Sequence, residues 1–447
     1  MHTAKDAGLA PPPRDVGTAP SRRRSAPAVG APHGLTPWPY PPDAPSEERY
    51  RGPLVSSQDR PQRTTALAFS PDSKWVAHGS LDGNIFLRRT TDPSIAVAQR
   101  AVGFSVCALA FSPDGRQLAS GHNGYVYVWS IGYGIGGWET HRRPESICAL
   151  AFSPSGEYLA SAHADIGVKV WRLDQEWLNG APSWKPCHTP DGGALKLAWS
   201  PDSTQLVVGS SDGRRIYVWN IQHEDLSFYI REPTRQQSTP PVALAFVLFS
   251  PDGRLIASGG GQGCCHIWNV GKRALQATLD EHDSSRTVLA AHFDAWSRFI
   301  VTGSDDGTAR GWNALNGKMC MSVSRGGPKP LVVQDVSFSP DRKLVLVAGA
   351  DGWLCLCASS PWYALAAPDG VVIERARFSQ DGRYLATGSA SGAVCVWQTH
   401  PAIPTPLGRI QELWDAVPRR DPRSDAWYDN WTGKWQPQPS NEHHTSA

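Results

Sequence analysis

The sequence lacks the features that would place the chain in a membrane or on a nucleic acid. It has no run of about 18 apolar residues, which a membrane-spanning helix requires. Its first residues, MHTAKDAGLAPPPRDVG, lack the apolar segment of a secretory signal peptide. Basic and acidic side chains balance at 43 to 41, whereas a nucleic-acid-binding protein usually carries a basic excess. We therefore expect a chain that neither enters a membrane nor contacts nucleic acid directly.

Motifs for catalysis and metal binding are also missing. The zinc motif HExxH does not occur. Gly132, Gly134 and Gly137 have dinucleotide-fingerprint spacing, but no βαβ unit surrounds them, so we interpret them as a flexible connection. Neighbouring side chains on a strand point to opposite faces, so the predicted strand segment Cys264–His266 cannot converge on one metal ion. The sequence therefore predicts no catalytic residue, no cofactor and no metal site.

The cysteines indicate a reducing compartment. There are nine, an odd number, and most lie within apolar, strand-like runs such as VCALAF and ICALAF. Cysteines of this kind behave as small buried apolar residues, and unpaired thiols persist inside cells. We expect an intracellular protein, cytoplasmic first, with the nucleus as the alternative.

One short phrase recurs along the chain, an apolar run that ends in Phe-Ser-Pro-Asp or a close variant. Copies begin at residues 66, 108, 149, 196, 246, 335 and 375, and a degenerate copy, AAHFDAW, occupies 290–296. The spacing of about 40–50 residues is typical of the four-stranded blade of a propeller.

Each phrase is followed by two further strand signals. The second strand is rich in small residues, as in QLASGH (117–122) and YLATGS (384–389), and a tight turn, often Asp-Gly, follows it. The third run ends in tryptophan in six copies: Trp129, Trp171, Trp219, Trp268, Trp312 and Trp397. Arg88 and Cys357 occupy this place in the first and seventh copies.

These residues resemble WD40 repeats over about residues 54–399. The resemblance implies an all-β fold, a closed WD40-type β-propeller. Eight copies predict eight blades, with seven, the commoner form in the family, as the alternative. A proline-rich head, residues 1–53 with 12 prolines, is expected to be disordered. A tail with tryptophan and proline, residues 400–447, is expected to be irregular.

The resemblance also predicts the outer, fourth strand of each blade. Candidate segments follow the third-strand tryptophans, at 94–101, 136–142, 226–231, 274–279, 319–323 and 362–366. The last copy is followed by the proline-rich segment 401–406, so we expect PLVSS at 53–57 to supply its outer strand.

Typical WD40 repeats open with Gly-His, and that histidine joins a buried set with Ser or Thr, Asp and Trp. Gly-His is absent from the repeat starts here. The sixth copy alone keeps a plausible set, whose members are His282, Thr302, Asp306 and Trp312. We therefore expect packing, rather than this network, to hold most blades.

In WD40 domains partners commonly bind the face where the first strands begin and the turns between second and third strands gather. Polar side chains near these strand starts differ from copy to copy, as a binding face requires. They are Arg63, Glu145, Arg286, Gln334, Glu374 and Arg375. The long connections 172–193 and 222–241 are further candidates.

Both chain ends carry short motifs. Ser25 follows three arginines and is a candidate phosphorylation site, while the same arginines could serve as a nuclear signal. Trp427, Trp431 and Trp435 have the spacing of one helix face. This part of the tail is expected to dock on the propeller or to bind a partner.

The sequence thus predicts a non-catalytic scaffold or adaptor that binds proteins or peptides, with the oligomeric state open. One alternative is a subunit of a nucleic-acid-associated complex. The other is an enzyme-associated propeller, which would need a polar cluster converging on the centre, whereas the strand starts are mainly apolar or small.

Overall fold

The regular structure of the chain is built from β-strands. The computed structural model describes residues 62–91, 96–100, 104–131, 138–139, 146–173, 184–187, 193–223, 225–233, 244–324, 331–357, 362–366, 372–399, 419–420, 427–429 and 434–436. All of them belong to the compact unit Glu47–Ala447. Among these residues there is no helix, and therefore none that could cross a bilayer.

Eight antiparallel sheets follow one another along the chain, each made of consecutive strands. The first sheet contains β1 (Thr64–Phe69), β2 (Trp75–Ser80), β3 (Asn84–Arg89) and β4 (Ala96–Arg100). The second contains β5 (Val106–Phe111), β6 (Gln117–His122), β7 (Tyr125–Ser130) and β8 (Trp138–Glu139). The third contains β9 (Ile147–Phe152), β10 (Tyr158–His163), β11 (Gly167–Arg172) and β12 (Trp184–Cys187). The fourth contains β13 (Ala194–Trp199), β14 (Gln205–Ser210), β15 (Arg215–Asn220) and β16 (Asp225–Arg231).

The remaining sheets repeat this order. The fifth contains β17 (Leu244–Phe249), β18 (Leu255–Gly260), β19 (Cys265–Asn269) and β20 (Ala274–Leu279). The sixth contains β21 (Val288–Phe293), β22 (Phe299–Ser304), β23 (Thr308–Asn313) and β24 (Met319–Ser324). The seventh contains β25 (Val333–Phe338), β26 (Val345–Gly349), β27 (Trp353–Cys357) and β28 (Trp362–Ala366). The eighth contains three described strands, β29 (Ile373–Phe378), β30 (Tyr384–Ser389) and β31 (Val394–Gln398).

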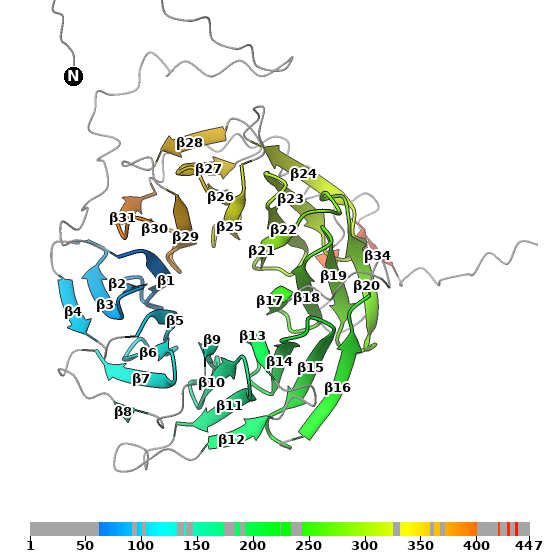
Figure 1. The fold of residues 1–447 in the computed structure, drawn as a ribbon. Coiled ribbons are helices and arrows are strands. Elements are labelled where there is room, and N and C mark those ends of the chain that lie inside the picture. The colour runs from blue at the N-terminus through cyan, green and yellow to red at the C-terminus, as the bar shows by residue number, and fades with distance from the viewer. Residues whose placement is uncertain are drawn as a thin grey trace, which may run out of the picture. The chain divides into compact units, whose positions relative to one another are not determined.

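The first strand of each sheet is the innermost, and the eight first strands surround a common centre (Figure 1). Consecutive first strands contact one another, and β1 also contacts β29 of the last sheet. Side chains from facing sheets interlock between them, as where Val301 of β22 packs with Val336 and Phe338 of β25. The apolar core is therefore divided into layers between neighbouring sheets, which explains why both faces of each sheet are apolar.

A glycine near the end of the second strand permits this close approach. A Cβ on Gly121 would lie 2.8 Å from Ile147 of the next sheet, and one on Gly303 would lie 2.7 Å from Val333. The same contact joins the last sheet to the first, because a Cβ on Gly388 would lie 2.5 Å from Thr64.

The turns between first and second strands, here called the first turns, contact one another from sheet to sheet. Gly115, Gly156, Gly253 and Gly382 each lie against a proline of the preceding first turn. Ser73, Ser203 and Ser297 replace glycine at this place with φ of 59–62°. Their hydroxyl oxygens instead accept a backbone N–H from the preceding first turn, donated by Asp381, Ser155 and Asp252 at 2.8–3.1 Å.

The first turn of the degenerate sixth copy has its own chemistry. Asp294 is fully buried and accepts backbone N–H groups from Arg298 at 2.6 Å and Phe299 at 2.7 Å. Arg342 of the next first turn, at φ 62°, pairs with Asp294 at 2.9 Å. Its guanidinium also lies 3.4 Å from the ring centre of Trp296, which is 60% exposed. All eight first turns are thus linked, the last with the first included.

The predicted fourth strands are present as β4, β8, β16, β20, β24 and β28. The sequence did not indicate β12, which pairs with β11 from Val168 to Trp171, because its segment WKPC lacks an apolar run. The segment 53–57, expected to complete the last sheet, and the head 1–53 lie outside the described residues.

The tail, expected to be irregular, contains three short strands, and the helix-face spacing of its tryptophans does not correspond to a helix at Trp427 and Trp435. Trp427 lies on β33 (Trp427–Asp429) and Trp435 on β34 (Lys434–Gln436), two strands of a small sheet with β32 (Arg419–Arg420). Tyr428 pairs with Trp435 across this hairpin, and Trp431 is outside the described residues. Gly433 and the flanking prolines oppose a helix, and they outweigh the i, i+4 spacing.

Candidate partner-binding face

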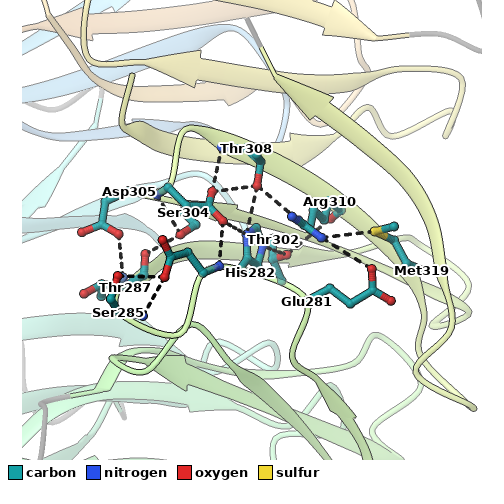
Figure 2. A network of polar contacts seen from close by, with 12 residues as sticks. Glu281, His282, Ser285, Thr287, Thr302, Ser304, Asp305, Thr308, Arg310 and Met319 are labelled. Carbon is teal, nitrogen blue, oxygen red and sulfur yellow. Dashed lines mark hydrogen bonds and ion pairs between the residues drawn. The ribbon is translucent and has the colours of Figure 1, made fainter. Parts of the chain in front are cut away.

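The hydrogen-bonded set predicted in the sixth copy is present, and Figure 2 labels two of its members, His282 and Thr302. His282 Nδ1 donates to Asp306 Oδ2 at 2.8 Å, and His282 Nε2 lies 2.8 Å from Thr302 Oγ1. Trp312 Nε1 donates to the same hydroxyl at 2.8 Å. The set ties the segment before β21 to the second and third strands, so it holds the turn Asp305–Gly307 in place.

Asp306 is kept ionised by its partners. Burial raises the pKa of this carboxyl, but hydrogen bonds from His282 and Thr308 lower it further, so that the net pKa is well below the usual value. The carboxylate is thus a fixed negative charge at neutral pH.

Two other sheets contain a related network of His, Ser and Trp, without the aspartate, that the repeat starts did not indicate. In the second sheet His122 closes the strand QLASGH, and its Nε2 lies 3.0 Å from Ser120 Oγ. Ser120 also accepts Trp129 Nε1 at 3.0 Å. His163 Nε2 lies 2.9 Å from Ser161 in the third sheet, and Trp171 donates to the same serine at 3.4 Å. The histidine comes from the end of the second strand, so a search at the repeat start misses it.

The remaining third-strand tryptophans differ in their partners. Trp268 donates to Ser258 at 2.9 Å and Trp397 to Thr387 at 3.3 Å. Trp219 Nε1 is buried without a hydrogen-bond partner among the described residues. The equivalent hydroxyl position in its sheet is Val208, two residues beyond the pairing partner of Trp219, Leu206. In the seventh sheet Val347 stands in place of the hydroxyl residue and Cys357 in place of the tryptophan, so both positions are apolar.

The segment Cys264–His266 holds an ion pair. His266 Nδ1 lies 2.8 Å from Glu232 Oε2, and both side chains are buried. Burial, with Glu232 as a further cause, raises the pKa of Cys265 well above its usual value. Within the described residues no group of three or more His, Cys, Asp or Glu is placed to hold a metal ion.

The run Gly209–Gly213 has the spacing of a GxSxG nucleophile elbow. It forms the turn between two strands, β14 and β15, and Ser210 Oγ donates to Asp212 at 2.5 Å. A nucleophile elbow needs a strand followed by a helix, so the geometry does not support a nucleophile at Ser211.

The starts of the first strands and the turns between second and third strands lie on one side of the sheets. Backbone hydrogen bonds join the two in several sheets: Leu81 N to Arg63 O, Ser211 N to Gly193 O, Ala350 N to Val332 O and Ala390 N to Val372 O. We call this side the entry face.

Three of the predicted partner-binding residues meet on the entry face. Arg63, 57% exposed, pairs at 3.1 Å with Glu374 of the last sheet. The guanidinium of Arg375 donates to the carbonyl oxygen of Glu374 at 2.7 Å. Glu374 and Gln334 are the extra residues of β-bulges in β29 and β25, which is how these side chains leave the regular ladder.

The other predictions are distributed differently. Arg286 is exposed before β21, where its carbonyl oxygen accepts Gly263 N at 2.7 Å. Gln334 is half-buried on β25. Glu145 and the candidate phosphorylation site Ser25 lie outside the described residues.

A polar cluster that the sequence did not indicate lies on the innermost strands. Arg377 of β29 pairs with the buried Asp335 of β25, whose Oδ2 also accepts Ala376 N at 3.1 Å. His292 of β21 accepts Phe338 N at 3.3 Å. Lys196 is the third residue of β13. The strands themselves still start with apolar residues, Ala194, Val288, Val333 and Ile373, and the polar side chains come at the third and fifth places. Aligning the copies residue by residue would have revealed them, since alanine occupies the place of Lys196 in four of the eight.

A profile of the family described as "WD domain, G-beta repeat" matches residues 56–88, 101–130, 135–172, 184–220, 234–269, 273–313 and 365–398. The matches cover more than half of the chain, which therefore belongs to the WD40 repeat family. The sheet whose first three strands remain unmatched is the seventh, where Val347 and Cys357 replace the hydroxyl and the tryptophan.

The chain matches only part of the length of its relatives. Telomerase protein component 1 of Rattus norvegicus is 25% identical over 311 residues, 67% of this chain and 11% of that protein. The Periodic tryptophan protein 2 homolog of Dictyostelium discoideum is 22% identical over 65% of this chain and 32% of its own. Guanine nucleotide-binding protein subunit beta-1 of Nicotiana tabacum is 29% identical over 46% of this chain and 55% of its own.

A solved structure supports the fold. The computationally designed Ika8 protein superposes with a TM-score of 0.62 at 24% identity, and the match covers 78% of this chain and 100% of that one.

Proposed function

We propose that the eight sheets form a closed, eight-bladed propeller. The support is the contact between the last sheet and the first, made by Gly388 with Thr64, by Asp381 with Ser73 and by Glu374 with Arg63. These contacts are of the same kinds as those between neighbouring sheets elsewhere. The first turns link in the same circular order, which a displaced blade would interrupt.

This propeller acts as a non-enzymatic scaffold or adaptor that binds proteins or peptides on its entry face. The observation that carries the proposal is the contrast between repeating core positions and non-repeating entry-face residues. Arg63, Arg286, Gln334, Glu374 and Arg375 each break the pattern of the copies, whereas the small second-strand residues repeat. A rigid ring that presents an irregular face is a binding platform.

The test is affinity purification with mass spectrometry on the full chain. A triple alanine variant at Arg63, Arg286 and Gln334 is expected to lose stoichiometric partners. A matched triple alanine variant at Lys74, Arg116 and Lys343, exposed residues of the first turns, should retain them. Equal retention by both variants contradicts binding at the entry face.

The proposed location is intracellular, supported by the free state of the eight described cysteines. The head, with Ser25 as its phosphorylation site, and the tail would recruit or regulate partners, and purification of residues 51–400 alone tests whether they do.

A second candidate is a subunit of a nucleic-acid-associated complex that does not itself contact the nucleic acid. The similarity to Telomerase protein component 1 favours it. Nuclease treatment during purification distinguishes the two, because a scaffold outside such a complex keeps all of its partners. The enzyme-associated alternative has less support, since the central Asp335 carboxylate is already engaged by Arg377 and by Ala376 N.

A further inference from the structure

The inference concerns two cations on the innermost strands of opposite sheets, and it rests on the proposed function of the entry face. Lys196 is the third residue of β13 and Arg375 the third residue of β29. These strands belong to the fourth and eighth sheets, which lie across the centre from one another (Figure 1). Each residue pairs with the equivalent second-strand glycine, Gly209 or Gly388, so both project at the same level of their sheets.

The surroundings at this level leave the two cations without an acid. The equivalent residues of four other sheets are alanine: Ala66, Ala108, Ala149 and Ala290. Asp335 occupies the equivalent place in the seventh sheet, and its carboxylate already pairs with Arg377 and accepts Ala376 N. Among the described residues no carboxylate lies within ion-pair distance of Lys196 or Arg375.

Neighbouring groups do not supply the missing charge. Glu374 is engaged by Arg63 at 3.1 Å. Burial raises the pKa of the Cys148 thiol, so that this neighbour of Lys196 is neutral at pH 7. Burial and the Arg375 guanidinium both lower the pKa of Lys196.

Such a pair is unfavourable in the free protein and becomes favourable when an anion lies between the charges. A partly buried site also strengthens the attraction relative to water. The turns of the entry face add carboxylates to the cations Arg63 and Arg286. These carboxylates are Asp82, Asp165, Asp212, Asp305 and Asp351. A partner that is acidic throughout would be repelled by them.

We propose that the entry face binds a peptide segment that inserts one anionic side chain, flanked by basic or neutral residues, between Lys196 and Arg375. The central cations receive the anionic group, and the carboxylates of the turns receive the flanking positive charge. This charge pattern would select partners as well as attract them.

The test uses two blocked, fluorescently labelled peptides in low salt. One carries a single glutamate between lysines, and the other a single lysine between glutamates. Binding to the full chain is measured by fluorescence anisotropy. We expect the glutamate-centred peptide to bind and the double variant Lys196→Met/Arg375→Met to bind it about tenfold more weakly. The control Lys343→Met, in a first turn, should bind as the wild type does, and Lys196→Arg should retain binding.

Thermal unfolding gives a second readout that needs no peptide. Lys196→Met should raise the Tm of the free protein at low salt by removing the repulsion. Inorganic phosphate should raise the Tm of the wild type more than that of the double variant. Tighter binding of the lysine-centred peptide, or equal affinity of wild type and double variant, overturns the inference. If neither peptide binds while partners still depend on Arg63, Arg286 and Gln334, the charge selection is wrong and the scaffold proposal stands.

Discussion

In each sheet a single Ser or Thr hydroxyl decides whether the indole N–H of the third-strand tryptophan has a hydrogen-bond acceptor. Thr302, Ser258, Ser120, Ser161 and Thr387 each accept the N–H of the tryptophan in their own sheet. The fourth sheet has lost the hydroxyl and kept the tryptophan. An unsatisfied buried donor costs about 1–3 kcal/mol, so this sheet carries a defect that the seventh sheet avoids by having lost both members.

Substituting Val208 by Thr should therefore be tolerated better than the same change at Val347. The new hydroxyl at position 208 meets the free N–H of Trp219, whereas at position 347 it meets Cys357. We expect the free energies of unfolding of the two variants to differ by about 1–2 kcal/mol, measured by urea denaturation. Equal destabilisation would show that Trp219 is satisfied in another way.

The ionised state of Asp306 makes the sixth sheet sensitive to acid. Its folded-state pKa lies below the unfolded value because hydrogen bonds from His282 and Thr308 outweigh burial. The carboxylate therefore contributes stability above about pH 4, and this contribution decreases as the pH falls further. The variant Asp306→Asn should be less stable than the wild type at pH 7, and the gap should narrow below pH 4. Urea unfolding across that range measures the gap, and a gap that widens in acid would contradict the assignment.

At the scale of the element, the substitutions in the first turn of the degenerate sixth copy compensate for one another. Asp294 replaces the serine of the phrase and Trp296 replaces its aspartate, while Arg342 replaces the glycine of the next turn. The arginine has a positive φ of 62°, which costs about 1 kcal/mol or more. Its contacts with Asp294 and Trp296 offset this cost, so the three departures form one unit.

Breaking this unit on one side should be worse than removing it whole. Arg342→Gly leaves the Asp294 carboxylate buried without its cation, which we expect to cost about 3 kcal/mol. The double variant Asp294→Ser/Arg342→Gly restores the common phrase. It should be more stable than the sum of the single variants indicates, by a coupling of about 1–3 kcal/mol. Additive effects in chemical denaturation would show that the pair is independent.

The recurring phrase was enough to predict most strands, because each blade is a local unit whose turns and apolar runs are written in consecutive residues. What it could not predict depends on neighbours. His122 and His163 make their hydrogen bonds from the end of the second strand. Lys196, Asp335 and Arg377 lie on separate sheets, so their contacts depend on how the sheets pack around the centre. The outer strand β12 is held by its partner β11 rather than by its own propensity.

For the whole molecule, the joint between the last and first sheets decides whether the ring is closed. Gly388→Val should destabilise the protein by about 1–3 kcal/mol through overpacking against Thr64. Gly121→Val, which meets Ile147 at an internal interface, is the matched control and should cost a similar amount. Thermal unfolding of both variants provides the comparison. A neutral effect of Gly388→Val alone would mean that the joint is open and that the ring proposal is wrong.

The first and last sheets meet through residues that are remote in the chain. The first turns of neighbouring sheets are about 45 residues apart, as with Asp252 and Ser297, whereas Arg63 and Glu374 are separated by 311 residues. Contacts between near residues form quickly, and a contact across the whole chain must wait for the entropy of loop closure to be met. We therefore expect one blade to be added to the next, with the meeting of Arg63 and Glu374 as the last step in forming the proposed ring.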